Sequence, residues 1–186
     1  MNHINRILHY LDSLAIIGII AMLCAAFGYQ FLTFELPCAL CAMQRMGLYA
    51  IAAGLMMNIY FQRTRLHYLM TILSATINGI IGLLQVILHI VPGSGSFGAS
   101  VFGLHMYTWN FIVCLVFIIY ASVAGMLTVE NQHHKASKLT KLIIVLLLLT
   151  LIANIVSAFL ECGPYLCPSD PQSYWLLDIL TGKPWI

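Results

Sequence analysis

The sequence predicts an all-α membrane protein, a single domain made of a bundle of transmembrane helices. Of the 186 residues, 61% are hydrophobic and only 8% are charged, whereas a water-soluble domain carries roughly 25% charged residues. The chain is also too apolar to be intrinsically disordered. Five apolar runs each reach the ~20 residues that cross a bilayer, and a chain in lipid must form helices to pair its backbone groups. These runs are about 11–32, 42–61, 68–91, 106–129 and 142–160.

We expect the first run to be retained as a transmembrane helix. It is longer than the 7–15 apolar residues of a secretory signal peptide, and no clear small-x-small cleavage site follows it. The last run is followed by a tail, residues 161–186, in which three prolines prevent the helix from continuing. Within this tail QSYWLLDIL, residues 172–180, is too short to span a bilayer, and its aromatic and apolar residues predict a helix lying along the membrane surface.

The basic residues predict how the chain is oriented. One arginine precedes the first run, two lie between the second and third runs, and three lysines lie between the fourth and fifth. These residues are Arg6, Arg63, Arg65, Lys135, Lys138 and Lys141. Short loops rich in lysine and arginine stay in the cytoplasm. We therefore expect a cytoplasmic N-terminus and a tail on the other side of the membrane.

With this topology, four of the six cysteines lie outside the cytoplasm, where disulfides form and persist. They form two close pairs, Cys38 with Cys41 and Cys162 with Cys167. The other two cysteines, Cys24 and Cys114, fall within apolar runs. We interpret these two as small buried apolar residues.

The pair Cys38-x-x-Cys41 has the pattern of a redox-active dithiol. Pro37 suits the first turn of a helix, so the pair is expected at the start of the second span. Arg45 follows at i+7 from Cys38, close to the same helix face. The helix macrodipole and a nearby arginine both favour the thiolate, which is the form of cysteine that attacks a disulfide.

Two stretches resemble the DsbB family, the quinone-linked membrane oxidoreductases that form disulfides. PCALCAMQR, residues 37–45, resembles the family signature Pro-Cys-x-Leu-Cys-x-x-Gln/Glu-Arg. FGLHMYTW, residues 102–109, resembles the Gly-Leu-x-Met-x-x-Trp motif that starts the family's fourth span. The resemblance implies a four-helix DsbB-like core, to which this chain adds a fifth transmembrane helix.

The resemblance also implies roles for individual residues. Cys41 matches the cysteine that forms a thiolate–quinone adduct, Cys38 matches the one that exchanges with a second cysteine pair, and Arg45 matches the arginine that faces the quinone. The implied activity is that of a protein-disulfide:quinone oxidoreductase, which supports disulfide bond formation. The implied cofactor is ubiquinone or menaquinone, the partner a periplasmic DsbA-like thioredoxin-fold oxidase, and the location the bacterial inner membrane. Typical members have four spans and end in the cytoplasm, whereas the fifth span and the basic residues of this chain predict a C-terminus in the periplasm.

The chain departs from the family pattern in its second cysteine pair. Typical members carry that pair between spans three and four, but residues 92–105 contain no cysteine. One hypothesis is that Cys162 and Cys167 replace it as a relay pair. The alternative is a structural disulfide that staples the turn at Gly163 and Pro164.

Other polar residues offer weaker candidates. His89 and His105 flank the 92–105 loop, and each is a candidate to donate a hydrogen bond to a quinone oxygen. The alternative for each is an interfacial histidine bonded to water. Asn78 and Gln85, in the third run, are expected to hydrogen-bond between helices. Two competing readings use the outer cysteines without catalysis, as ligands of one structural zinc ion or as parts of a membrane scaffold.

Overall fold

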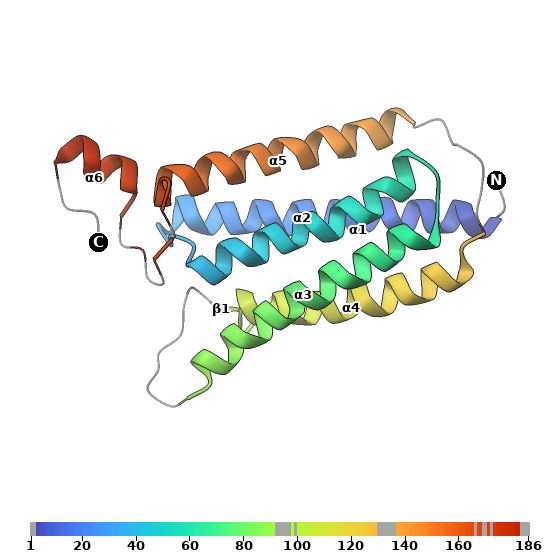
Figure 1. Ribbon diagram of the computed structural model, residues 1–186, viewed down its shortest axis with the longest axis horizontal. Coiled ribbons are helices and arrows are strands. Elements are labelled where there is room, and N and C mark those ends of the chain that lie inside the picture. Colours follow the sequence, from blue (N-terminus) through green and yellow to red (C-terminus); the bar gives the residue numbers. More distant parts are fainter. Residues whose placement is uncertain are drawn as a thin grey trace.

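Five long helices form the body of the protein. The computed structural model describes residues 3–91, 98, 100–129, 137–165, 167–168, 171 and 173–182. The helices are α1 (His3–Leu32), α2 (Ala39–Tyr60), α3 (Arg65–His89), α4 (Met106–Leu127) and α5 (Lys138–Cys162), and they run alongside one another (Figure 1). Each is long and apolar enough to cross a membrane. The predicted all-α membrane bundle, including its fifth span, is therefore confirmed.

Short elements lie between and after the long helices. An antiparallel hairpin of β1 (Ser100–Val101) and β2 (Leu104–His105) leads into α4. The hairpin turns at Phe102 and Gly103, both of which have positive φ, as in the tight turns favoured between two strands. After α5 the chain forms one further short helix, α6 (Trp175–Thr181). The predicted tail helix is thus present, although shorter than the apolar stretch that predicted it.

The packing brings the start of α2 to the same end of the bundle as the tail. Helix α2 contacts α1, α3 and α5, while α3 packs most extensively on α4. The beginning of α1 and helix α6 lie at opposite ends of the bundle (Figure 1). The end that carries α6 also holds the end of α1, the start of α2, the end of α3 and the end of α5. Residues far apart in the sequence therefore meet there.

Helices α2 and α3 approach closely at two glycines of α2. A Cβ atom at Gly47 would overlap the side chain of Asn78, and one at Gly54 would overlap that of Thr71. Small residues are the usual means of bringing transmembrane helices into close contact, because the hydrophobic effect does not drive helix association in lipid. Close approach at these two positions fixes how α3 lies against α2.

Helix α1 begins at His3, earlier than the residue 11 expected from the apolar run. A helix can continue beyond the bilayer, so the apolar run sets only the minimum length. The extra turns are anchored, because Asn5 Nδ2 donates to the backbone carbonyl of Val129 at 3.0 Å. This bond joins the first turns of α1 to the segment that follows α4.

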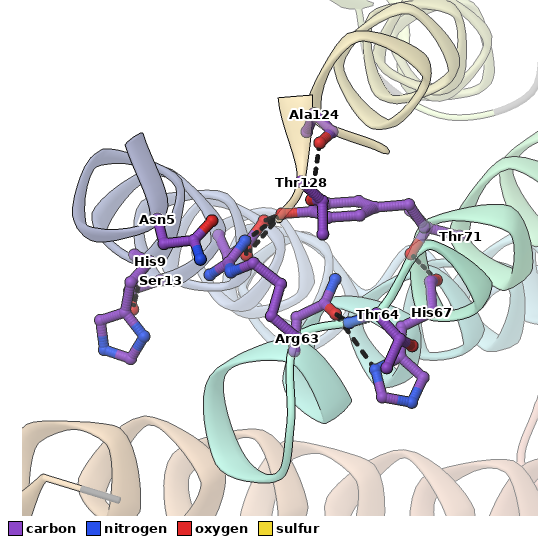
Figure 2. Close-up of polar contacts among 12 residues, drawn as sticks. Asn5, His9, Ser13, Arg63, Thr64, His67, Thr71, Ala124 and Thr128 are labelled. Carbon is purple, nitrogen blue, oxygen red and sulfur yellow. Dashed lines mark hydrogen bonds and ion pairs between the residues drawn. The ribbon is translucent and has the colours of Figure 1, made fainter. Parts of the chain in front are cut away.

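A buried ion pair holds the helices together at the end of the bundle opposite α6. Asp12 and Arg63 are 0% and 6% exposed, and Arg63 Nη1 lies 2.6 Å from Asp12 Oδ2. Tyr68 and Tyr120 both donate their hydroxyl groups to the same carboxylate, at 2.9 Å and 2.6 Å. Arg63 also donates to the Tyr68 hydroxyl (Figure 2). The sequence analysis assigned Arg63 to membrane topology alone, whereas the structure also gives it a partner from α1.

The tail packs back against the end of α5. Gly163 caps α5 with φ +63°, and a Cβ atom at this position would overlap the ring of Trp175. Trp175 also packs edge-on against Phe159, with ring centroids 5.9 Å apart. Three apolar side chains of α6, Leu177, Ile179 and Leu180, remain exposed. Most of residues 92–99, in the expected 92–105 loop, lie outside the described residues, and so do residues 130–136.

Replacing Asp12 with alanine tests the role of the ion pair. The change leaves the Arg63 charge buried without its carboxylate, and breaking a buried pair in this way costs about 3–5 kcal/mol. We expect a clearly lower midpoint of thermal unfolding in detergent, followed by the helical circular dichroism signal. Arg65→Ala, which removes an exposed arginine two residues away, is the control. Equal midpoints for the two variants would contradict this role.

Candidate active site

The cysteine pair Cys38–Cys41 forms a disulfide at the start of α2. Cys38 is the N-cap residue, with extended backbone angles, and its Sγ accepts a hydrogen bond from the Cys41 backbone N–H at 3.1 Å. This bond satisfies one of the backbone donors that a helix leaves unpaired at its N-terminus. The pair therefore lies at the positive end of the helix dipole, as the Pro-Cys-x-x-Cys pattern predicts.

The two cysteines have different surroundings. Cys38 is only 5% exposed. Cys41 is half-buried and lines a cavity between the helices. Gln85, from α3, reaches both sulfurs: its Nε2 lies 3.4 Å from Cys38 Sγ and 3.5 Å from Cys41 Sγ. Because Cys41 lines the cavity and Cys38 does not, Cys41 is the cysteine that faces the cavity.

The cavity has a volume of about 550 Å³, within the range of small-molecule sites. Its walls come from α1, α2, the 35–37 segment, the hairpin and α4. The lining residues are Met22, Leu23, Ala25, Ala26, Tyr29, Glu35, Leu36, Pro37, Cys41, Gln44, Arg45, Leu48, Gly98, Val101, Phe102, Met106, Tyr107, Trp109, Asn110 and Val113. Most of these side chains are apolar. In the described part of the lining, Arg45 is the one cation and Glu35 the one acidic residue.

Arg45 lies one helical turn beyond Cys41 and is 9% exposed. Its guanidinium donates to Gln30 Oε1 at 2.8 Å and to the Ala26 carbonyl at 3.2 Å, both on α1. It also lies over the Phe27 ring, 5.1 Å from the ring centroid, a favourable cation–π geometry. The structure thus places Arg45 and Cys41 in the wall of one cavity, with the arginine held from α1.

A polar network connects Arg45 to the tail. The Nε2 of Gln30 donates to Ser157 Oγ at 2.8 Å and to the Tyr174 hydroxyl at 3.4 Å. The carboxylate of Glu161, 1% exposed, interacts electrostatically with Arg45. Glu161 and Tyr174 lie before and after the second cysteine pair in the sequence, so both ends of the segment that carries this pair contact the network.

Cys162 and Cys167 form the second disulfide, directly after α5. Cys162 is 2% exposed, whereas Cys167 is half-buried. Disulfide sulfurs are not the thiolates that bind zinc, so the zinc hypothesis finds no support in this arrangement. Among the described residues, no three His, Cys, Asp or Glu side chains are grouped to hold a metal ion. Cys24 and Cys114 are both free thiols, but only Cys114 is buried, so the expectation of burial is wrong for Cys24.

The two candidate histidines lie beside Tyr107 rather than in the cavity wall. His89 and His105 stack against the Tyr107 ring with centroid distances of 5.4 Å and 5.3 Å. Their Nδ1 atoms lie within hydrogen-bond distance of the carbonyl oxygens of Gln85, at 2.8 Å, and Gly98, at 3.1 Å. Tyr107 lines the cavity, but neither histidine is among its described lining residues. Any contribution they make to a bound group would pass through Tyr107.

Sequence reasoning did not identify the residues that support the site. Gln85 was expected only to bond between helices, and Gln30 and Tyr107 were given no site role. Gln44, which donates to Gln85 Oε1 at 2.6 Å, is part of the matched signature but was assigned no contact. The polarity of Gln85 within an apolar helix is a usable signal, although it does not reveal that the partners are sulfurs.

Comparison with known proteins bears on the first three helices. The family model described as disulfide bond formation protein DsbB matches residues 10–97, a little under half of the chain. The match includes both cysteines of the first pair, Arg45 and Gln85, and it ends before the hairpin, α4, α5 and the tail. No match was found among curated proteins or among solved structures. The resemblance seen in the sequence is confirmed over this segment, while the second cysteine pair lies outside it.

Proposed function

We propose that this multi-pass membrane protein is a thiol:quinone oxidoreductase, because the family model described as disulfide bond formation protein DsbB matches residues 10–97. It would oxidise a periplasmic DsbA-like thioredoxin-fold protein and pass the electrons to a membrane quinone. One observation carries the proposal: Cys41, from the redox pair, and Arg45 line the same largely apolar cavity. This arrangement places a reactive sulfur and a positive charge around space for a lipid-soluble electron acceptor.

The residues of the cavity suit a quinone. Its apolar walls match the ring and the isoprenoid chain, and a guanidinium carries five N–H donors that can reach a carbonyl oxygen. The hydrogen bonds described for Arg45 use its Nη1 and Nη2 once each, so further donors remain. Trp109 also lines the cavity, but its Nε1 already donates to the Val101 carbonyl at 2.9 Å. Arg45 is thus the one cationic donor in the described part of the lining.

A bound quinone would supply a two-electron, two-proton acceptor. The protein's part is to present Cys41 as a thiolate, which the N-terminus of α2 and the Arg45 charge both stabilise. The same charge stabilises negative charge that develops on an oxygen in the cavity. Because Gln30 and Ala26 hold the guanidinium from α1, Arg45 is already in position when electrons arrive.

The tail pair is proposed to relay electrons from the soluble partner. A thiolate of the partner attacks Cys167, the more exposed sulfur of that pair, and the bond to Cys162 breaks. The partner's second thiolate then displaces Cys167, which leaves the partner oxidised and the tail pair reduced. One thiolate of the reduced tail pair attacks Cys38, and the Cys38–Cys41 bond breaks with Cys41 leaving as the thiolate. The second tail thiolate then displaces Cys38, which re-forms Cys162–Cys167 and leaves Cys38 and Cys41 reduced. Since Cys38 is 5% exposed, this exchange requires the first turn of α2 to open.

The direction of electron flow sets the proposed orientation. The partner and the tail must lie in an oxidising compartment, where disulfides persist. The end of the bundle with α6 and both disulfides is therefore proposed to face the periplasm. The beginning of α1 would then lie at the cytoplasmic side of the bacterial inner membrane, in agreement with the arginine and lysine distribution.

Quinone turnover tests this function directly. We expect purified protein to reduce a short-chain quinone, followed by its absorbance, when supplied with a reduced thioredoxin-fold substrate. Cys41→Ser should abolish turnover, and Arg45→Met should lower it by at least about tenfold because a preorganised charge is lost. Arg65→Met, at the other end of the bundle, should leave the rate unchanged. Full turnover by the Cys41→Ser protein would rule the function out.

A double variant of the tail, Cys162→Ser with Cys167→Ser, tests whether the tail pair relays electrons or is only a structural disulfide. We expect it to stop oxidising the protein substrate while still reducing quinone when a small dithiol reduces Cys38–Cys41 directly. A normal rate with the protein substrate would show that the tail pair is not a relay. A parallel loss with both reductants would instead point to a structural disulfide.

A further inference from the structure

Gln85, on α3, lies within hydrogen-bond distance of both sulfurs of the proposed redox pair. It is 1% exposed, and its Nε2 lies 3.4 Å and 3.5 Å from the sulfurs of Cys38 and Cys41. These are hydrogen-bond distances for a sulfur acceptor. By contrast, the amide of Asn78, also on α3, donates to Asn110 on α4 at 3.1 Å.

The orientation of the Gln85 amide is fixed by a second glutamine. Gln44 Nε2 donates to Gln85 Oε1 at 2.6 Å, which occupies the oxygen and directs the NH₂ group toward the disulfide. A flipped Gln85 amide would place its oxygen against sulfur and its NH₂ group against the NH₂ group of Gln44, so both contacts would be lost. Gln44 is 6% exposed, so water has little access to compete for these bonds. The two glutamines therefore act as a unit.

The amide contacts favour one redox state over the other. A disulfide sulfur is a weak, neutral acceptor, whereas a thiolate carries a full charge and accepts much stronger hydrogen bonds. Donation from Gln85 therefore stabilises the reduced pair more than the disulfide. A pair whose reduced form is stabilised is a stronger oxidant, the principle that makes some thioredoxin-fold proteins strongly oxidising.

We propose that Gln85 is a positioning residue that raises the reduction potential of Cys38–Cys41 by donating its amide hydrogens to the two sulfurs. The inference deepens the proposed function, because it explains how this pair can accept electrons from an oxidising partner. It needs neither the quinone nor the tail pair. It can therefore be tested with glutathione alone.

The test is a redox titration of the full-length protein in detergent, in glutathione buffers without added quinone. As the Cys38–Cys41 bond breaks, two glutathione thiols are oxidised to one glutathione disulfide. Cys38 takes up one of the two protons, and the other goes to the buffer while Cys41 stays a thiolate. Acid quenching, alkylation and peptide mass analysis report this pair separately from Cys162–Cys167. We expect Gln85→Met, which keeps the length of the side chain but removes its donors, to lower the equilibrium constant for reduction about tenfold, which is about 30 mV.

Asn78→Ala is the matched control, because it also removes a buried amide of α3, whose hydrogen bonds go to Asn110 and Cys114 rather than to Cys38–Cys41. Its equilibrium constant should equal that of the unaltered protein, since a loss of stability common to both redox states does not change the potential. Gln44→Met leaves Gln85 in place but unfixed and should shift the constant in the same direction by a smaller factor. This second variant keeps the test available if Gln85→Met does not fold.

The outcomes separate the two claims. An unchanged constant in Gln85→Met, or in Gln44→Met if only that variant folds, would overturn the role of Gln85 and leave the proposed function standing. So would an equal shift in Asn78→Ala. If glutathione does not reduce Cys38–Cys41 in the unaltered protein at any ratio of reduced to oxidised glutathione, the proposed thiol chemistry fails, and the inference fails with it.

Discussion

The proposed redox site depends on how the first turn of α2 is built. The turn begins with Cys38 as the N-cap, whose sulfur accepts the Cys41 backbone N–H. This geometry buries Cys38 and leaves Cys41 at the wall of the cavity. Helical periodicity then places Arg45 one turn further along the same wall. A single helix start therefore fixes the sulfur nearest the cavity and the charge beside it, and residues from α1 and α3 only adjust that arrangement.

Polar side chains inside the bundle are paired across helices at both ends, as the absence of water in lipid demands. At the end opposite α6, the carboxylate of Asp12 takes hydrogen bonds from Arg63, Tyr68 and Tyr120. At the other end, Arg45 bonds to α1, and Gln30 continues the network to α5 and the tail. The first cluster fixes the packing of the helices, whereas the second also surrounds a cavity and two disulfides.

Much of this arrangement could be predicted from the sequence, because its determinants are local. Apolar length predicts the five helices, Pro37 and the cysteine spacing predict the helix start, and the i+7 spacing places Arg45 near the pair. Contacts between distant segments were not predictable in the same way. The bond from Gln85 to sulfur depends on the rotation of α3 against α2, which close approach at Gly47 and Gly54 sets. The same holds for Arg63, whose partner Asp12 lies on α1, and for the two histidines stacked on Tyr107.

The central claim is that Arg45 and the start of α2 keep Cys41 in its thiolate form beside the cavity. The most direct measurement is the rate at which iodoacetamide alkylates Cys41 across a pH series, in a Cys38→Ser background with and without Arg45→Met. The account predicts rapid alkylation already at neutral pH, and a rate about tenfold lower there once Arg45 is replaced, since an ordinary cysteine is mostly protonated at that pH. Identical profiles for the two proteins, both matching a free cysteine, would contradict it.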